Sequence, residues 1–282
     1  MLNKHNIPKV VVPKVSEKID DMNCLPNPFI ADKIELQLLS PQCSKYKDFL
    51  MDFINQYPNI NTYILHIPFL FVSIHMIYSS EKLRREFVAF IVDCIKISNK
   101  YNKEINILFH METPIKIFEH CGGIEWVNFI VSLVQDTNVY FLVENSMFTL
   151  ENKDKDGGPF YHLVKRIDNP HLRICFDICH SQINENLFED KYGLAKDIGK
   201  YTKSIHFSYT ANNDGYKDGK THGRVHPNID ALENDLQWLI EKGFDLNNTY
   251  LVTEINEDNY TKRPDLIKEL SLLEEVIAKY DK

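Results

Sequence analysis

Eight short apolar runs recur along this chain of 282 residues, and helix-like segments separate most of them. The runs are apolar at nearly every position, as is typical of parallel strands that helices cover. We predict strands over residues 10–15, 34–39, 63–67, 105–109, 139–144, 172–177, 203–208 and 250–254. The apolar periodicity predicts helices over 79–100, 123–136, 160–167, 229–243 and 264–280. Eight strand–helix units in a chain of this length predict an α/β fold, a single (β/α)8 TIM barrel.

An open, doubly wound sheet is the alternative to a closed barrel. That fold normally carries a Gly-rich first turn, and the chain contains neither GxGxxG nor GxxxxGK[ST]. The first strand carries Pro13 and is the weakest of the eight. No linker divides the chain, so we expect one domain over 1–282, with the polar stretches 151–158 and 211–220 as active-site loops.

Bulk properties restrict the partners of the chain. The formal net charge of −8 argues weakly against general binding to nucleic acid or anionic membranes. The sequence has no apolar stretch of spanning length, and its start, MLNKHNIPK, lacks a signal-peptide core. The six cysteines show no CxxC pair, so we expect reduced thiols and a cytoplasmic protein without a membrane partner.

Residue types that bind metals recur about once per strand–helix unit. Six apolar runs end in or contain such residues: His66, His110, Glu144, Asp177 with His180, His206, and Glu254. A seventh, turn-like stretch, DGKTHGRVH, offers Asp218, His222 and His226. Core packing does not explain this series, because buried carboxylates and imidazoles need partners.

In a barrel, the carboxyl ends of the strands converge on one mouth, so four of these residues would share one centre: Glu144, Asp177, His206 and Glu254. Three carboxylates around one point repel each other unless a cation neutralises them. A mixed carboxylate and imidazole set suits Mn²⁺, Zn²⁺, Co²⁺ or Fe²⁺. His66 and His110 could hold a second metal with Glu144 as a bridge, and His180 with His222 a third.

The motifs HIPF, FH, VEN, FDICH, IHFS and TE resemble those of the endonuclease IV branch of the xylose isomerase-like barrels, over about residues 30–256. There the motifs read HxPY, HPG, EN, DTCH, HLND and ET. The resemblance implies three metal sites: His66, His110 and Glu144; Glu144, Asp177, His206 and Glu254; and His180 with His222. It also implies that Phe69 helps to open DNA at an abasic site.

Some motifs depart from that branch. HLNDSK is replaced by HFSYTA, the Gly-rich turn after EN by ENSMFTLENKD, and a DxH pair by Asp218 and His222 at DxxxH spacing. Ultraviolet-damage endonucleases share the barrel and a related HxS element. Sugar isomerases and epimerases of the superfamily need only the Glu–Asp–His–Glu centre, where two glutamates move a proton on either side of an enediolate.

The first functional expectation is hydrolysis of a phosphodiester in abasic or damaged DNA, because His66 and His110 have no necessary task in a mononuclear isomerase. Glu144 would bridge the metals, and Glu254 would anchor one or act as the base. The alternative is a sugar or sugar-phosphate isomerase or epimerase in which Glu144 and Glu254 transfer the proton. A barrel that keeps its metal only as a binding scaffold is a third class. The expected cofactors are one to three divalent ions, zinc or manganese.

Site residues differ between these expectations. We expect catalytic roles for Glu144, Glu254 and His180, and substrate contacts from Phe69, Arg224 and His226, with His222 and His226 competing for one ligand position. Metal content discriminates the classes: two or three ions per chain favour hydrolysis, and one favours isomerisation.

Overall fold

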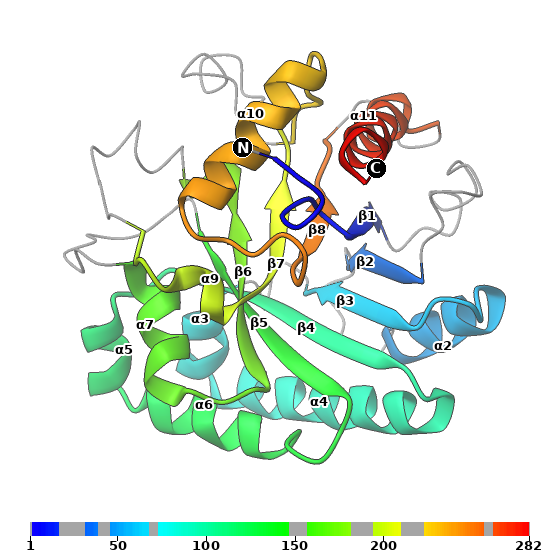
Figure 1. Cartoon of the computed structure of the whole chain (residues 1–282). Helices are drawn as coiled ribbons and strands as arrows, with labels where there is room; N and C mark the ends of the chain where they lie inside the picture. Colours follow the sequence, from blue (N-terminus) through cyan, green and yellow to red (C-terminus); the bar gives the residue numbers. More distant parts are fainter. Residues whose placement is uncertain are drawn as a thin grey trace.

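Eight parallel strands form a closed barrel in the order β1 to β8, as the computed structural model shows (Figure 1). The structure describes residues 2–16, 32–38, 46–67, 73–146, 157–181, 194–209, 223–256 and 262–281. The strands are β1 (Val10–Ser16), β2 (Lys33–Gln37), β3 (Thr62–His66), β4 (Glu104–Met111), β5 (Val139–Asn145), β6 (Leu172–Asp177), β7 (Thr202–Phe207) and β8 (Tyr250–Thr253). The predicted (β/α)8 barrel is therefore confirmed.

All eight predicted strands are present, with small shifts at their ends. Strand β4 extends to Met111, so His110 lies within the strand and pairs with Glu144 of β5. Strand β8 ends at Thr253, so Glu254 directly follows it. Pro13 lies inside β1, which pairs with both β2 and β8. A closed barrel has no edge strand, so the proline costs a ladder donor within the sheet.

Helices surround the barrel. They are α2 (Tyr46–Gln56), α3 (Ile74–Ser79), α4 (Glu81–Tyr101), α5 (Ile115–His120), α6 (Gly123–Ser132), α7 (Gly158–Ile167), α9 (Ile198–Tyr201), α10 (Ile229–Glu241) and α11 (Pro264–Tyr280). The five predicted helices correspond to α4, α6, α7, α10 and α11. Side-chain caps fix two of their starts: Ser80 accepts from the backbone N–H of Leu83, and Asn228 from that of Ala231. Among the described residues, no helix is long and apolar enough to cross a membrane.

Two apolar layers make the core. The larger one fills the space between strands and helices. The smaller one lies inside the barrel and contains one residue from each of six strands: Val12, Ile64, Leu108, Leu142, Cys175 and Val252. Because side chains alternate along a strand, the residues two positions further on point into the barrel as well. Those residues are Lys14, His66, His110, Glu144, Asp177 and Glu254, so a polar layer lies directly above the inner apolar layer.

The amino-terminal ends of the strands carry a separate polar cluster. Lys203 Nζ lies 2.9 Å from Glu104 Oε1 and 3.8 Å from the centre of the Tyr140 ring. The Tyr250 hydroxyl donates to the same Glu104 oxygen at 3.4 Å. The inner apolar layer separates this cluster from the polar layer at the mouth, so the two can be altered independently.

Candidate metal centre

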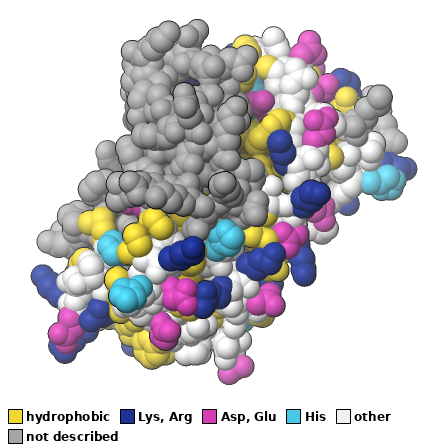
Figure 2. Space-filling model, turned by 90° about the vertical axis from the view of Figure 1, so that its left-hand side faces the viewer, with side chains coloured by type: hydrophobic (Ala, Val, Ile, Leu, Met, Phe, Trp, Pro, Cys, Tyr) yellow, Lys and Arg dark blue, Asp and Glu magenta, His cyan; other side chains and the backbone are white. Residues whose placement is uncertain are grey.

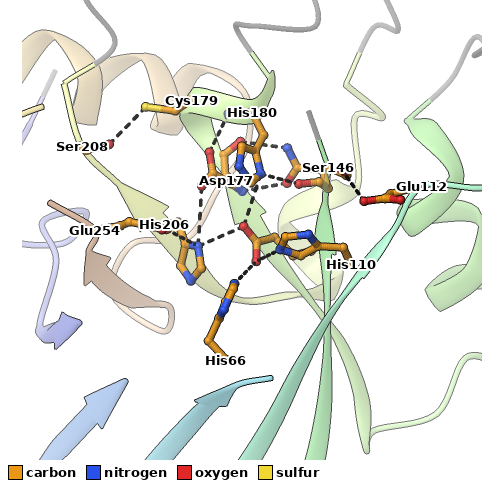
Figure 3. A network of polar contacts seen from close by, with 12 residues as sticks. His66, His110, Glu112, Ser146, Asp177, Cys179, His180, His206, Ser208 and Glu254 are labelled. Carbon is orange, nitrogen blue, oxygen red and sulfur yellow. Dashed lines mark hydrogen bonds and ion pairs between the residues drawn. The ribbon is translucent and has the colours of Figure 1, made fainter. Parts of the chain in front are cut away.

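Four side chains from β5, β6, β7 and the end of β8 meet in the polar layer (Figure 3). Ligand atoms of Glu144, Asp177, His206 and Glu254 all lie within 4.8 Å of one another, and all four residues are buried. His206 Nδ1 lies 2.7 Å from Glu254 Oε2, 3.1 Å from Glu144 Oε1 and 3.6 Å from Asp177 Oδ2. The structure thus brings together the four residues that the sequence assigns to one centre.

His66 and His110 lie on the other side of Glu144. Their Nε2 atoms are 3.3 Å and 2.9 Å from Glu144 Oε2, and their rings meet edge to face at 5.4 Å. The ligand atoms of these three residues also lie within 4.8 Å of one another, so they form a second group that could hold a metal ion. Glu144 therefore directs one oxygen toward His206 and the other toward His66 and His110.

The two histidines differ in protonation. Burial, followed by the charge of Lys14, lowers the pKa of His66 to about 4, so its ring is neutral near pH 7. Burial also lowers the pKa of His110, but Glu144 and Glu112 raise it above its ordinary value. A neutral imidazole is the form that binds a metal, and His66 holds that form near pH 7.

The charges of the centre fit a divalent cation. Burial raises the pKa of Glu144, but His206 and His110 together lower it well below its ordinary value, so it is ionised. Burial likewise lowers the pKa of His206, but Cys175, Glu144, Glu35 and Glu254 raise it well above its ordinary value. Nδ1 of His206 thus lies among three carboxylates, where a cation would bind. Carboxylates together with an imidazole are a donor set for Mn²⁺, Co²⁺, Fe²⁺ or Zn²⁺.

Asn145 and His180 support the centre from its rim. The Asn145 amide donates to the Asp177 carbonyl oxygen at 2.8 Å and accepts from the Asp177 backbone N–H at 2.7 Å. His180 Nδ1 lies 2.7 Å from the Asn145 carbonyl oxygen, which can only accept, so Nδ1 carries the hydrogen. Any ligand contact by His180 would therefore use Nε2. The hydrogen bonds of Asn145 also join the ends of β5 and β6, where the EN and DICH motifs lie.

Two residues of this layer were not predicted from the sequence. Lys14 of β1 is 5% exposed and Glu35 of β2 is 0% exposed, although both are charged. Glu35 contacts His206, and Lys14 contacts Glu254 and Glu35. The signal was present in the sequence, since KVVVPKVS and KIELQ each carry a charged residue at a position that a barrel strand turns inward.

His226, which the sequence assigns to a substrate or metal contact, lies in the structure with both ring nitrogens paired to carboxylates of other elements. Its ring is fully buried against Phe207, whose side chain faces away from the barrel interior because the neighbouring His206 faces inward. Nδ1 lies 2.6 Å from Glu269 Oε1, and Nε2 lies 3.1 Å from Asp235 Oδ2. His226 therefore ties the segment after β7 to helices α10 and α11.

We expect His226 to make stability depend on pH. Burial lowers the pKa of His226, but Asp235 and Glu269 raise it above 6.5, so its stabilisation is complete below pH 6.5 and is lost as the pH rises through the raised folded pKa. His226→Gln should cost about 3 kcal/mol at about pH 6, since it leaves the buried Glu269 without a cation. Thermal melts at about pH 6 and about pH 9 should show the gap to the wild type narrowing at the higher pH. A gap that stays constant across pH would show that His226 acts as a neutral group.

The remaining predicted residues are only partly placed. Phe69, Asp218 and His222 lie outside the described residues. Arg224 stands at the mouth, because its carbonyl oxygen accepts from the N–H of Tyr209 after β7, and the adjacent Gly223 accepts from Asn256 after β8. The third metal site, which needs His222, is therefore untested.

One face of the described surface mixes basic and acidic side chains. On the face in Figure 2, the Lys and Arg side chains of the described part alternate with Asp and Glu side chains, without forming a continuous basic patch. This distribution agrees with the net charge of −8.

Residues 41–273 match the family model described as xylose isomerase-like TIM barrel. This match agrees with the family resemblance in the motifs. A search among curated proteins found no sequence match. The chain resembles the crystal structure of a D-tagatose 3-epimerase-like protein, with a TM-score of 0.55 and 20% identity over 95% of this chain and 98% of the other.

Two further solved structures share the fold. The 3-keto-D-glucoside 4-epimerase of E. coli has a TM-score of 0.52 and 12% identity over 93% of this chain and 98% of its own. A Thermus thermophilus protein soaked with ZnCl₂ has a TM-score of 0.57 and 14% identity over 95% of this chain and 98% of its own. At these identities the likeness concerns the fold, and none of the three names includes a nuclease activity.

Proposed function

The chain belongs to the xylose isomerase-like TIM barrel family, and from this premise we propose that it is a divalent-metal-dependent isomerase or epimerase of a small sugar or sugar phosphate. The observation that carries the proposal is the placement of Glu144 and Glu254. Each directs one carboxylate oxygen at His206 Nδ1, at 3.1 Å and 2.7 Å, from strands on either side of β7 along the chain. Two carboxylates around one centre can act as general base and general acid when a proton moves between adjacent carbons.

Asp177, His206, Glu144 and Glu254 would hold the cation. When bound, a divalent metal would polarise the carbonyl group of the substrate and so acidify the neighbouring C–H. Glu144 would take or return a proton on one face of the substrate, and Glu254 would do so on the other. His180, beside Asp177 and 5% exposed, would contact a substrate hydroxyl.

His66 and His110 gain a task in this proposal. Both contact Glu144 Oε2, the oxygen that points away from His206. A carboxylate that exchanges protons needs hydrogen-bonding partners in both of its charge states, and an imidazole can donate or accept through its ring nitrogens. The fold relatives named as epimerases of sugars support the substrate class.

Isotope exchange tests the proposal without knowledge of the product. The protein with Mn²⁺ or Co²⁺ is incubated in D₂O with a panel of ketoses, aldoses and their phosphates, and proton NMR follows the hydrogen next to the carbonyl carbon. We expect that signal to disappear for at least one sugar and to persist when the metal is chelated. A metal-loaded protein that exchanges none of the panel would refute the proposed activity.

A second candidate function is phosphodiester hydrolysis with two metals. The group of His66, His110 and Glu144 favours it, because a shared Glu144 could bridge two ions in the arrangement used for phosphoryl transfer. A nicking assay on an abasic-site duplex with Zn²⁺, Mn²⁺ or Co²⁺ tests it. Two results together would favour hydrolysis over isomerisation. The wild type would cleave the duplex but show no sugar exchange, and His66→Ala would lose the cleavage.

A further inference from the structure

A buried charged pair stands beside the four candidate ligands. Lys14 and Glu35 come from neighbouring strands β1 and β2, and they are 5% and 0% exposed. Neither belongs to the ligand group of Glu144, Asp177, His206 and Glu254. A buried charge persists only where its partners offset the loss of water, so the contacts of this pair indicate what it does.

Lys14 and Glu35 link two of the candidate ligands, His206 and Glu254, through contacts outside the ligand group. Glu35 Oε2 lies 2.9 Å from His206 Nε2, and Glu35 Oε1 lies 3.2 Å from Lys14 Nζ. Lys14 Nζ in turn lies 2.5 Å from Glu254 Oε1. The series His206, Glu35, Lys14, Glu254 thus begins and ends on candidate ligands.

Glu35 fixes which nitrogen of His206 faces the centre. Glu35 Oε1 lies 3.2 Å from the Lys14 ammonium, and a carboxylate paired with an ammonium offers its other oxygen, Oε2, as a hydrogen-bond acceptor. Nε2 of His206 therefore carries a hydrogen and donates it to Glu35. Nδ1 is then the nitrogen left to bind a metal, and it is the one that faces Glu144, Asp177 and Glu254.

Lys14 acts on the other end of the series. Its ammonium holds Oε1 of Glu254, and the second oxygen, Oε2, points to His206. The same ammonium lies between Glu35 and Glu254, two buried carboxylates that would otherwise repel each other. Lys14 thus supplies a positive charge to both carboxylates, Glu35 and Glu254.

We propose that Glu35 and Lys14 are positioning residues that set His206 and Glu254 in metal-binding geometry before the ion arrives. Glu35 orients the imidazole, and Lys14 balances and holds the two carboxylates. This inference rests on the proposed function only in requiring that the four-residue group binds a metal, and it concerns neither the substrate nor the reaction.

Glu35→Gln tests the orienting role through metal binding. Because the amide offers a neutral and weaker acceptor to His206, Co²⁺ should bind about 10- to 100-fold more weakly, and the visible spectrum of bound Co²⁺ should change. Glu104→Gln is the matched control, since it also removes a carboxylate paired with a lysine inside the barrel, at the opposite end. The control should keep both the Co²⁺ affinity and the spectrum of the wild type.

Lys14→Met tests the balancing role through stability. Without the ammonium, the melting temperature of the metal-free protein should fall by about 5–10 °C, since two buried carboxylates lose their cation. Saturating Mn²⁺ should recover most of that loss, because the ion supplies the missing positive charge. A residue that only packs would lower both melting temperatures equally.

The outcomes separate the two proposals. The positioning role would be overturned if Glu35→Gln kept the Co²⁺ affinity and spectrum of the wild type. It would also be overturned if Lys14→Met lowered the melting temperature equally with and without Mn²⁺. Neither result would affect the metal binding or the sugar exchange of the wild type. A wild type that binds Co²⁺ but exchanges no sugar would overturn the proposed function alone. A wild type that binds no metal would overturn both.

Discussion

Glu144→Gln is expected to reduce the rate of deuterium exchange by about 10³- to 10⁴-fold, which removes detectable turnover. Glutamine has nearly the same shape but cannot accept the proton, and it replaces a carboxylate that contacts His206 on one side and His110 on the other. NMR exchange rates under saturating Mn²⁺ measure the loss.

Matched variants show whether the loss is chemical. Glu104→Gln is the control, because Glu104 is also a carboxylate inside the barrel but pairs with Lys203 at the opposite end of the strands. It should retain exchange within about threefold, as changes outside the reacting groups usually do. Exchange in Glu144→Gln at close to the wild-type rate would remove Glu144 from the mechanism.

Metal binding is expected to raise the melting temperature by about 5–10 °C. An ion at about 100 times its dissociation constant stabilises the native state by about 2.7 kcal/mol, and a chain of this size gains about 2–4 °C per kcal/mol. The gain should be large here because the ion relieves repulsion among Glu144, Asp177 and Glu254, which are all buried. Calorimetric melts with Mn²⁺ and with a chelator measure it.

Asp177→Asn should lose most of this metal-dependent gain, since the amide removes one anionic ligand. Asp93→Asn, at a half-buried residue paired with Lys47 on the outer helices, should keep it. Equal gains in both variants would mean that the ion binds elsewhere.

Most of the fold could be predicted from the pattern of apolar strands. Parallel strands covered on both faces are apolar throughout, so eight such runs could be located from the sequence even where Pro13 interrupts one of them. Helix α9 has four residues, and α3 and α5 have six each, which is too short for a helical period to emerge.

The ligand group could be predicted because its members follow one rule. Glu144, Asp177, His206 and Glu254 each stand at the carboxyl end of a strand, where a barrel gathers side chains. Lys14 and Glu35 lie within their strands rather than at the ends, and a single lysine or glutamate in a short strand does not indicate which residue it pairs with.

His226 was assigned to the site from the sequence, whereas Lys14 and Glu35 were missed. His226 lies near the other histidines in the sequence. Only tertiary packing shows that its Nδ1 pairs with Glu269 on the last helix. The expectation of an endonuclease rested on motifs that do not separate the branches of the family. Its motifs are shared across the family, and the residues that would read DNA fall largely in segments outside the described part of the chain, such as Phe69 and His222.

Native mass spectrometry of the protein titrated with Mn²⁺ or Co²⁺ tests the central claim most directly. We predict one tightly bound ion per wild-type chain and loss of that ion in Asp177→Asn, because the four-residue group is the high-affinity site. Two tightly bound ions per chain would favour the hydrolase that uses His66 and His110. A wild type that retains no ion, or an Asp177→Asn variant that retains as many as the wild type, would contradict the assignment of the metal to this centre.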